Sequence, residues 1–188
     1  GLGLIIGSFL NVVILRLNTQ KTIGGRSACM SCRSTLSWYE LIPVFSYLGL
    51  GGKCKTCKSK ISMQYPLVEL LTGIVFALLF LKFGDLFLYD IIAFSISYAY
   101  YALLCSLLIV ITVYDLKHKI IPDILSLVFG IFAFIGIFIF DHGYLSLHWP
   151  SLSDFLAGFV LSVPFALLWL LSRGKWMGLG DGKLLVGL

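Results

Sequence analysis

The feature that most constrains the fold is a set of long runs with almost no charge. Residues 87–114 contain a single charged side chain, Asp90, close to the start of the run. Shorter apolar runs occupy residues 1–15, 67–81, 120–140 and 154–171. A lipid core of about 30 Å needs about 20 apolar residues in a helix. Because backbone groups in lipid must bond within their own segment, we expect these runs to be transmembrane helices.

Composition agrees with a membrane protein. Of 188 residues, 59% are hydrophobic and 12% are charged, whereas a soluble domain is about half apolar and a quarter charged. The chain opens at Gly1 without Met, and an apolar run resumes at Leu184. We therefore expect both ends to be truncated. The expected fold is an all-α polytopic bundle of about six or more transmembrane helices, the last ones cut off.

The basic residues predict the orientation. Alternating the spans places residues 16–60, 117–119 and 173–183 on one side, with every Lys and Arg except Lys82. Short loops rich in Lys and Arg stay in the cytoplasm. The net charge of +5 is then a matter of topology, and no nucleic-acid partner is predicted.

Four of the five cysteines form two Cys-x-x-Cys pairs, which are typical of a metal site. They are Cys29, Cys32, Cys54 and Cys57. Two such pairs can hold a structural zinc tetrahedrally, in a small zinc-ribbon-like cytoplasmic domain. Redox-sensing or simply reduced cysteines are the alternative. Cys105 lies within residues 87–114, where we expect it to pack.

Two aspartates follow apolar runs and are predicted to face the cytoplasm. Asp115 ends the third predicted span, and Asp181 follows the fifth, flanked by Gly178 and Gly180. Two neighbouring carboxylates share a proton, so one can activate a water while the other polarises a substrate carbonyl. Alternatively, Asp115 is an ordinary interfacial residue, and Asp123 is a helix-start residue.

The motifs together resemble those of the type IV prepilin peptidases, which are bacterial integral-membrane aspartic proteases. The resemblance rests on the four cysteines and on motifs that follow one another along nearly the whole chain. These motifs are Gly-Ser-Phe-Leu-Asn at residues 7–11, residues 61–69, Tyr114-Asp115 through Asp123, and Gly-Leu-Gly-Asp at residues 178–181. Tyr-Asp with Gly-x-Gly-Asp is also similar to presenilin-type proteases, but the cysteine loop favours the prepilin branch.

The resemblance implies a function and a domain plan. The catalytic aspartates would be Asp115 and Asp181, which cut leader peptides from prepilins and pseudopilins at the cytoplasmic face of the bacterial inner membrane. The plan is a first transmembrane helix (1–16), a cytoplasmic four-cysteine domain (17–63) and a transmembrane protease domain (64–188). Many family members also methylate the new N-terminus with S-adenosylmethionine.

Some questions stay open at this level. Glu69, one turn inside the second span, would pair with a basic residue, bind substrate or help hold the methyl donor, since acids in a membrane are costly. The apolar segment 38–47 would lie against membrane lipids. The oligomeric state is not predicted. A non-enzymatic zinc-ribbon assembly factor or a proton-coupled transporter is the alternative function.

Overall fold

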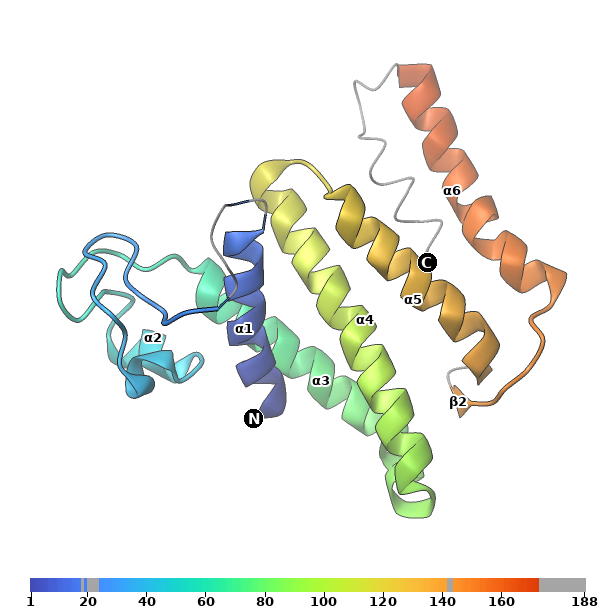
Figure 1. Ribbon diagram of the computed structural model, residues 1–188, viewed down its shortest axis with the longest axis horizontal. Coiled ribbons are helices and arrows are strands. Elements are labelled where there is room, and N and C mark those ends of the chain that lie inside the picture. Colours follow the sequence, from blue (N-terminus) through green and yellow to red (C-terminus); the bar gives the residue numbers. More distant parts are fainter. Residues whose placement is uncertain (18, 20–23, 142–143, 173–188) are drawn as a thin grey trace. The chain divides into compact units, whose positions relative to one another are not determined.

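The computed structural model describes residues 1–17, 19, 24–141 and 144–172, and it is mostly helical (Figure 1). The helices are α1 (Leu2–Arg16), the short 3-10 helix η1 (Trp38–Leu41), α2 (Phe45–Gly49), α3 (Gln64–Tyr89), α4 (Ile91–His118), α5 (Asp123–Ile139) and α6 (Leu152–Ser172). The strands β1 (Phe140–Asp141) and β2 (Tyr144–Leu145) form one antiparallel hairpin, which was not predicted. The predicted sixth span falls outside the described residues.

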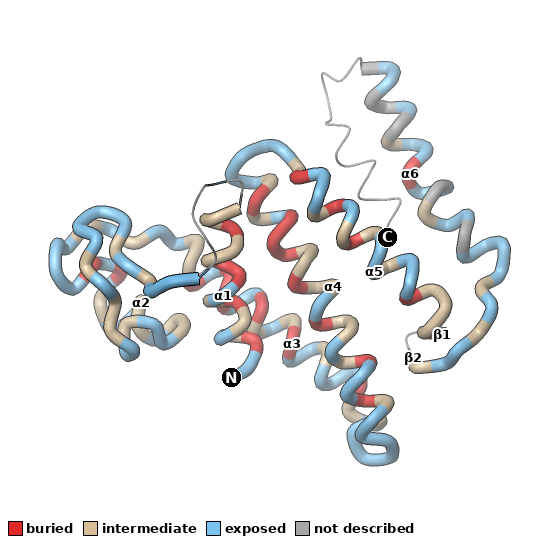
Figure 2. Tube along the Cα trace, viewed as in Figure 1, coloured by how far each residue is buried: buried red, intermediate tan, exposed pale blue. Residues whose placement is uncertain are grey.

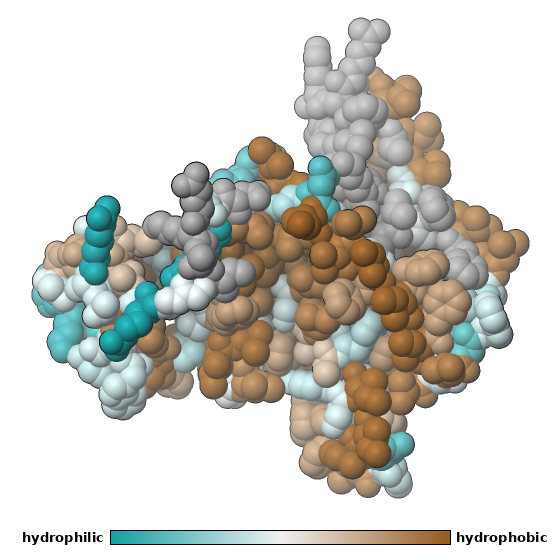
Figure 3. Space-filling model, in the orientation of Figure 1, coloured by the Kyte–Doolittle hydropathy of each residue, from teal (hydrophilic) through white to brown (hydrophobic). Residues whose placement is uncertain are grey.

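The helices α3 and α4 are long and apolar enough to cross a membrane. Only 28% of the apolar window of α3 and 33% of that of α4 is buried, whereas the core helix of a soluble protein is mostly buried. Exposed residues dominate the helix surfaces in Figure 2, and apolar colour covers much of them in Figure 3. A stripe along α3 consists of Leu67, Leu71, Ile74, Leu78 and Leu81, all exposed. Such a stripe needs lipid or another apolar partner, as is expected of a membrane protein.

The boundaries of these helices differ from the sequence expectation. Helix α3 continues beyond residue 81 to Tyr89, through the polar residues Lys82 and Asp85. Helix α4 begins only after Asp90, whose carboxylate accepts the backbone N–H groups of Ile92 and Ala93 at 3.0 Å each. This is an N-cap, which satisfies donors that have no partner inside the helix.

The chain folds into two compact units, Gly1–Leu81 and Lys82–Leu188, and the boundary falls inside α3. In the first unit, α1 packs antiparallel to α3 through glycines. A Cβ on Gly3 would lie 2.8 Å from Cβ of Phe76, and one on Gly7 would lie 2.7 Å from Cα of Glu69. The glycines of α1 therefore allow its backbone to approach α3 closely.

In the second unit, a hydrogen bond from a tyrosine side chain joins α4 to α5. The Tyr100 hydroxyl donates to the backbone carbonyl of Phe132 at 3.0 Å. Gly136 gives this hydroxyl its space, since a Cβ there would lie 2.6 Å from Cζ of Tyr100. The Tyr100 ring also stacks on Phe140, with centroids 4.4 Å apart. The β1–β2 hairpin thus starts from a residue that packs on α4.

Candidate functional site

The four paired cysteines converge on one point, as the sequence predicted. Their sulfur atoms all lie within 4.8 Å of one another, and Sγ of Cys29 is 3.8 Å from Sγ of Cys57. A tetrahedral ion with metal–sulfur bonds of about 2.3 Å places its ligands about 3.8 Å apart. Four thiols at this spacing fit a closed tetrahedral metal site with no position left for substrate.

Each half of this cluster is the same small hairpin, repeated along the chain. In the first, the Cys29 N–H donates to the Ser34 carbonyl and the Arg33 N–H to the Cys29 carbonyl, at 2.9 and 3.0 Å. In the second, Cys54, Ser59 and Lys58 form the equivalent pair of bonds at the same distances. The bridges Ala28–Thr35 and Lys53–Lys60 close the two hairpins.

The repeat also has a signal in the sequence, beyond the spacing of the cysteines. Both halves read Cys-x-x-Cys, then a basic residue, then Ser. The basic residues, Arg33 and Lys58, each adopt a left-handed backbone with φ of 58°, where glycine is the usual residue. Backbone N–H groups in both hairpins hydrogen-bond to the sulfur atoms.

These N–H groups favour the thiolate form that metals bind. The backbone amides of Cys32 and Ser31 lower the pKa of Cys29 to about 6. The side chain and then the backbone of Ser59 lower the pKa of Cys57, and the sulfur of Cys57 lies 3.1 Å from the Ser59 hydroxyl. In Cys54, by contrast, burial and the side-chain hydrogen bonds to Cys29 and Cys57 raise the pKa. One thiol in each half, Cys29 and Cys57, is therefore favoured as the thiolate.

Asp115 lies in the last turn of α4 and is half-buried. Its backbone carbonyl accepts the N–H of Lys119 at 2.6 Å, and Lys119 ends the helix with a φ of 57°. The preceding Tyr114 is buried and stacks on His118, with centroids 4.4 Å apart. Within the described residues, the Asp115 carboxylate has no hydrogen-bond or ion-pair partner. An acid at the negative end of a helix is unfavourable, so the position indicates a role other than stability.

Of the other residues singled out in the sequence, some lie within the described part of the structure and some do not. Asp181, with Gly178 and Gly180, lies outside the described residues, so its pairing with Asp115 stays a prediction. Asp123 is the first residue of α5, after Pro122, as expected of a helix-start residue. Cys105 is half-buried within α4, in keeping with the packing role predicted for it.

Glu69 is buried in α3, with 7% of its surface exposed. Its carboxylate accepts the backbone N–H of Val44 at 2.7 Å, and the Ser8 side chain also hydrogen-bonds to it. Nearby, the Asn11 amide donates to the Tyr65 carbonyl at 3.1 Å. The observed partners of Glu69 are therefore Ser8 of α1 and a backbone amide of the cysteine-containing segment, and neither was predicted from the sequence.

Comparison with known proteins places this arrangement in a family. Residues 2–83 match the Bacterial Peptidase A24 N-terminal domain, and residues 102–188 match the Type IV leader peptidase family. The prepilin leader peptidase/N-methyltransferase of Neisseria gonorrhoeae is 32% identical over all of this chain, and that of Pseudomonas aeruginosa is 33% identical over 98% of it.

The chain belongs to the type IV leader peptidase family. A further family member, the prepilin leader peptidase/N-methyltransferase of Myxococcus xanthus, is 43% identical over 64% of this chain. The chain spans 70% of the Neisseria relative, 68% of the Pseudomonas relative and 34% of the Myxococcus relative. No solved structure matches it significantly. The predicted resemblance is thus confirmed, and these relatives give the non-enzymatic alternatives no support.

Proposed function

We propose that this protein removes the leader peptide from type IV prepilins and pseudopilins. The observation that carries the proposal is the continuous similarity of the chain to relatives named prepilin leader peptidase/N-methyltransferase. The half-buried carboxylate at the end of α4 supports it, because an acid there has no structural partner among the described residues.

The reaction would use Asp115 and Asp181 as a proton-sharing pair. The ionised carboxylate removes a proton from a water molecule, whose oxygen attacks the carbonyl carbon of the scissile bond. The protonated carboxyl donates its proton to the carbonyl oxygen. When the tetrahedral intermediate collapses, the C–N bond breaks and the leaving amine takes up a proton. No covalent enzyme intermediate is formed.

The proposed roles of the cysteines and of the membrane helices also rest on the similarity to this family. Cys29, Cys32, Cys54 and Cys57 would hold a structural zinc ion, which would stabilise residues 17–63 as a zinc ribbon and leave no open position for chemistry. The protein would cross the inner membrane as a bundle of six or more helices, with residues 64–188 as the protease domain. The distribution of Lys and Arg supports a cytoplasmic location for the cysteines and both aspartates.

Incubation of the purified protein with a synthetic prepilin in detergent tests the proposal, with the leader followed by mass. Asp115→Asn and Asp181→Asn should each abolish cleavage while the helical circular dichroism is unchanged. Asp123→Asn is the matched control, because Asn also suits a helix start, and it should keep full activity. Full activity of either Asn variant at position 115 or 181 would remove that residue from the pair.

Methylation is a second activity to test, since the relatives are named as N-methyltransferases as well as peptidases. S-adenosylmethionine would be the methyl donor. Adding it to the same incubation should increase the mass of the cleaved substrate by one methyl group. A cleaved product of unchanged mass would limit the proposal to proteolysis.

A further inference from the structure

A tight turn connects the two short helices of the cysteine-containing segment, and a membrane helix holds it. Val44 has a φ of 62°, and the Phe45 N–H donates to the Pro43 carbonyl at 2.6 Å across it. The N–H of Val44, at the centre of this turn, donates to the carboxylate of Glu69 at 2.7 Å. The junction between η1 and α2 is therefore fixed to α3.

This bond sets the height of η1 and α2 relative to the bilayer. Glu69 lies five residues after the start of α3 at Gln64, which is about 8 Å along the axis at 1.5 Å per residue. The headgroup layer on each side of the lipid core is about 5–8 Å thick. If α3 crosses the membrane from its first turn, Val44 lies at the depth of that layer rather than free in water.

The surface at this height is apolar. Trp38 of η1 and Phe45 and Leu48 of α2 have 78%, 68% and 68% of their surfaces exposed. Beside them, an open apolar hollow is lined by Tyr39, Ile42, Phe45, Ser46, Gly49 and Leu50. Tryptophan and other large apolar side chains are enriched where membrane proteins meet the interface.

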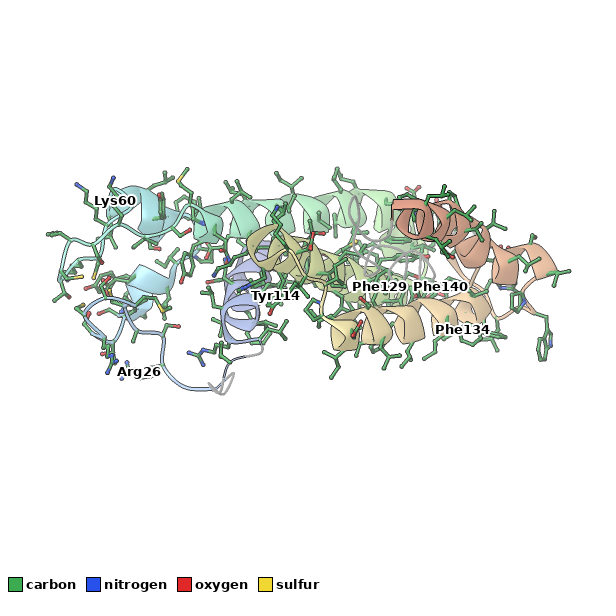
Figure 4. The ribbon with its side chains drawn as sticks, turned by 90° about the horizontal axis from the view of Figure 1, so that it is seen from above. Arg26, Lys60, Tyr114, Phe129, Phe134 and Phe140 are labelled. Carbon is green, nitrogen blue, oxygen red and sulfur yellow. The ribbon has the colours of Figure 1, made fainter. Side chains whose placement is uncertain are left out.

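The segment that carries this surface is almost entirely positive in its charge. Between residues 17 and 63 the acidic residues amount to Glu40, against the basic residues Lys21, Arg26, Arg33, Lys53, Lys55, Lys58 and Lys60. Figure 4 shows Arg26 and Lys60 on opposite sides of the cysteine-containing region. Lys55 borders the apolar surface directly, since its ammonium donates to the Tyr39 hydroxyl at 2.6 Å. Anionic lipid headgroups attract such a set.

We propose that η1 and α2 form a lipid-docking segment, which inserts Trp38, Phe45 and Leu48 into the anionic interface of the bilayer at the Gln64 end of α3. Glu69 acts as its positioning residue. Together with the hydrogen bond from Ser8, this bond accounts for an acid inside an apolar helix, because a buried carboxylate needs donors. The proposal stands apart from the proteolytic function, since it uses neither aspartate.

Tryptophan fluorescence in proteoliposomes tests this directly. With Trp149, Trp169 and Trp176 replaced by Phe, the full chain keeps Trp38 as its one tryptophan. In vesicles of phosphatidylglycerol and phosphatidylethanolamine, lipids brominated near the headgroup should quench most of its emission. The quenching should fall when phosphatidylcholine replaces both. If the triple variant does not fold, the difference between the parent chain and Trp38→Phe alone gives the same measurement.

Matched variants separate docking from mere proximity to the membrane. With Trp38→Phe also present, Thr56→Trp puts the tryptophan at the exposed tip of the second cysteine hairpin, where the quenching should be several-fold weaker. Glu69→Ala should reduce the quenching of Trp38, whereas Glu69→Gln, which keeps an acceptor oxygen, should preserve it. Equal quenching at positions 38 and 56 would overturn the proposal. An unquenched Trp38 would also overturn it. So would protection of Trp38 in detergent that increases with protein concentration, because a second copy of the chain would then cover this surface instead of lipid.

Discussion

Gly136 of α5 offers a sharp test of how the second unit is held together. Substituting Gly136→Ala places a methyl group against the Tyr100 side chain, 2.6 Å from its Cζ atom. Forcing a methyl group into a packed site costs about 1–3 kcal/mol. Displacing the Tyr100 hydroxyl also sacrifices its bond to Phe132, and such bonds contribute about 0.6 kcal/mol in membrane proteins. Alanine returns about 1 kcal/mol of helix propensity. The expected net loss is about 0.6–2.6 kcal/mol, or roughly 3- to 80-fold in the unfolding equilibrium.

The assay is equilibrium unfolding in mixed micelles with increasing sodium dodecyl sulfate, followed by circular dichroism. Gly130→Ala is the matched control on the same helix, because a Cβ on Gly130 meets nothing within 4 Å, and it should be neutral or stabilising. The decisive variant is Gly136→Ala combined with Tyr100→Leu, which empties the space above the glycine. That double variant should be no less stable than Tyr100→Leu alone. Additive losses in the double variant would refute the steric explanation.

Two further predictions concern helix capping and the metal site. Asp90→Ala removes the acceptor for two N–H groups at the start of α4 and should cost about 1 kcal/mol in the same unfolding assay. Asp85→Ala, an exposed acid within α3, should cost much less; an equal loss would reject the cap. The purified protein should contain one zinc ion per chain by elemental analysis. Cys54→Ser should lose that ion while Cys105→Ser keeps it, and zinc retained by the Cys54 variant would exclude this ligand set.

The sequence predicted best those features that depend on residues close together along the chain. Apolar runs predicted where helices occur, because lipid admits few other backbone structures. Their ends were less predictable, since Lys82 and Asp85 are polar yet continue α3. The Cys-x-x-Cys spacing predicted that the thiols meet, because each pair already forms half of a tetrahedral site.

The contacts made over long distances were beyond sequence reasoning. Nothing in the residue type of Glu69 identifies a backbone amide 25 positions away as its partner, because every residue except proline carries the same donor. The sequence identifies Trp38 and Phe45 as part of an apolar segment. Their depth relative to the membrane can be inferred only from the bond between Val44 and Glu69. The pairing of Asp115 with Asp181 is of the same kind and stays a prediction.

The doubled hairpin around the cysteines has a consequence for how the region assembles. Each half closes with bonds between near neighbours, so it can form early and by itself, before any ion arrives. What remains is to bring the two hairpins together across the segment between them, and the entropy cost of closing such a segment grows only slowly with its length. An ion bound by both cysteine hairpins would act as a removable cross-link. Its loss should separate the two hairpins without unfolding either one.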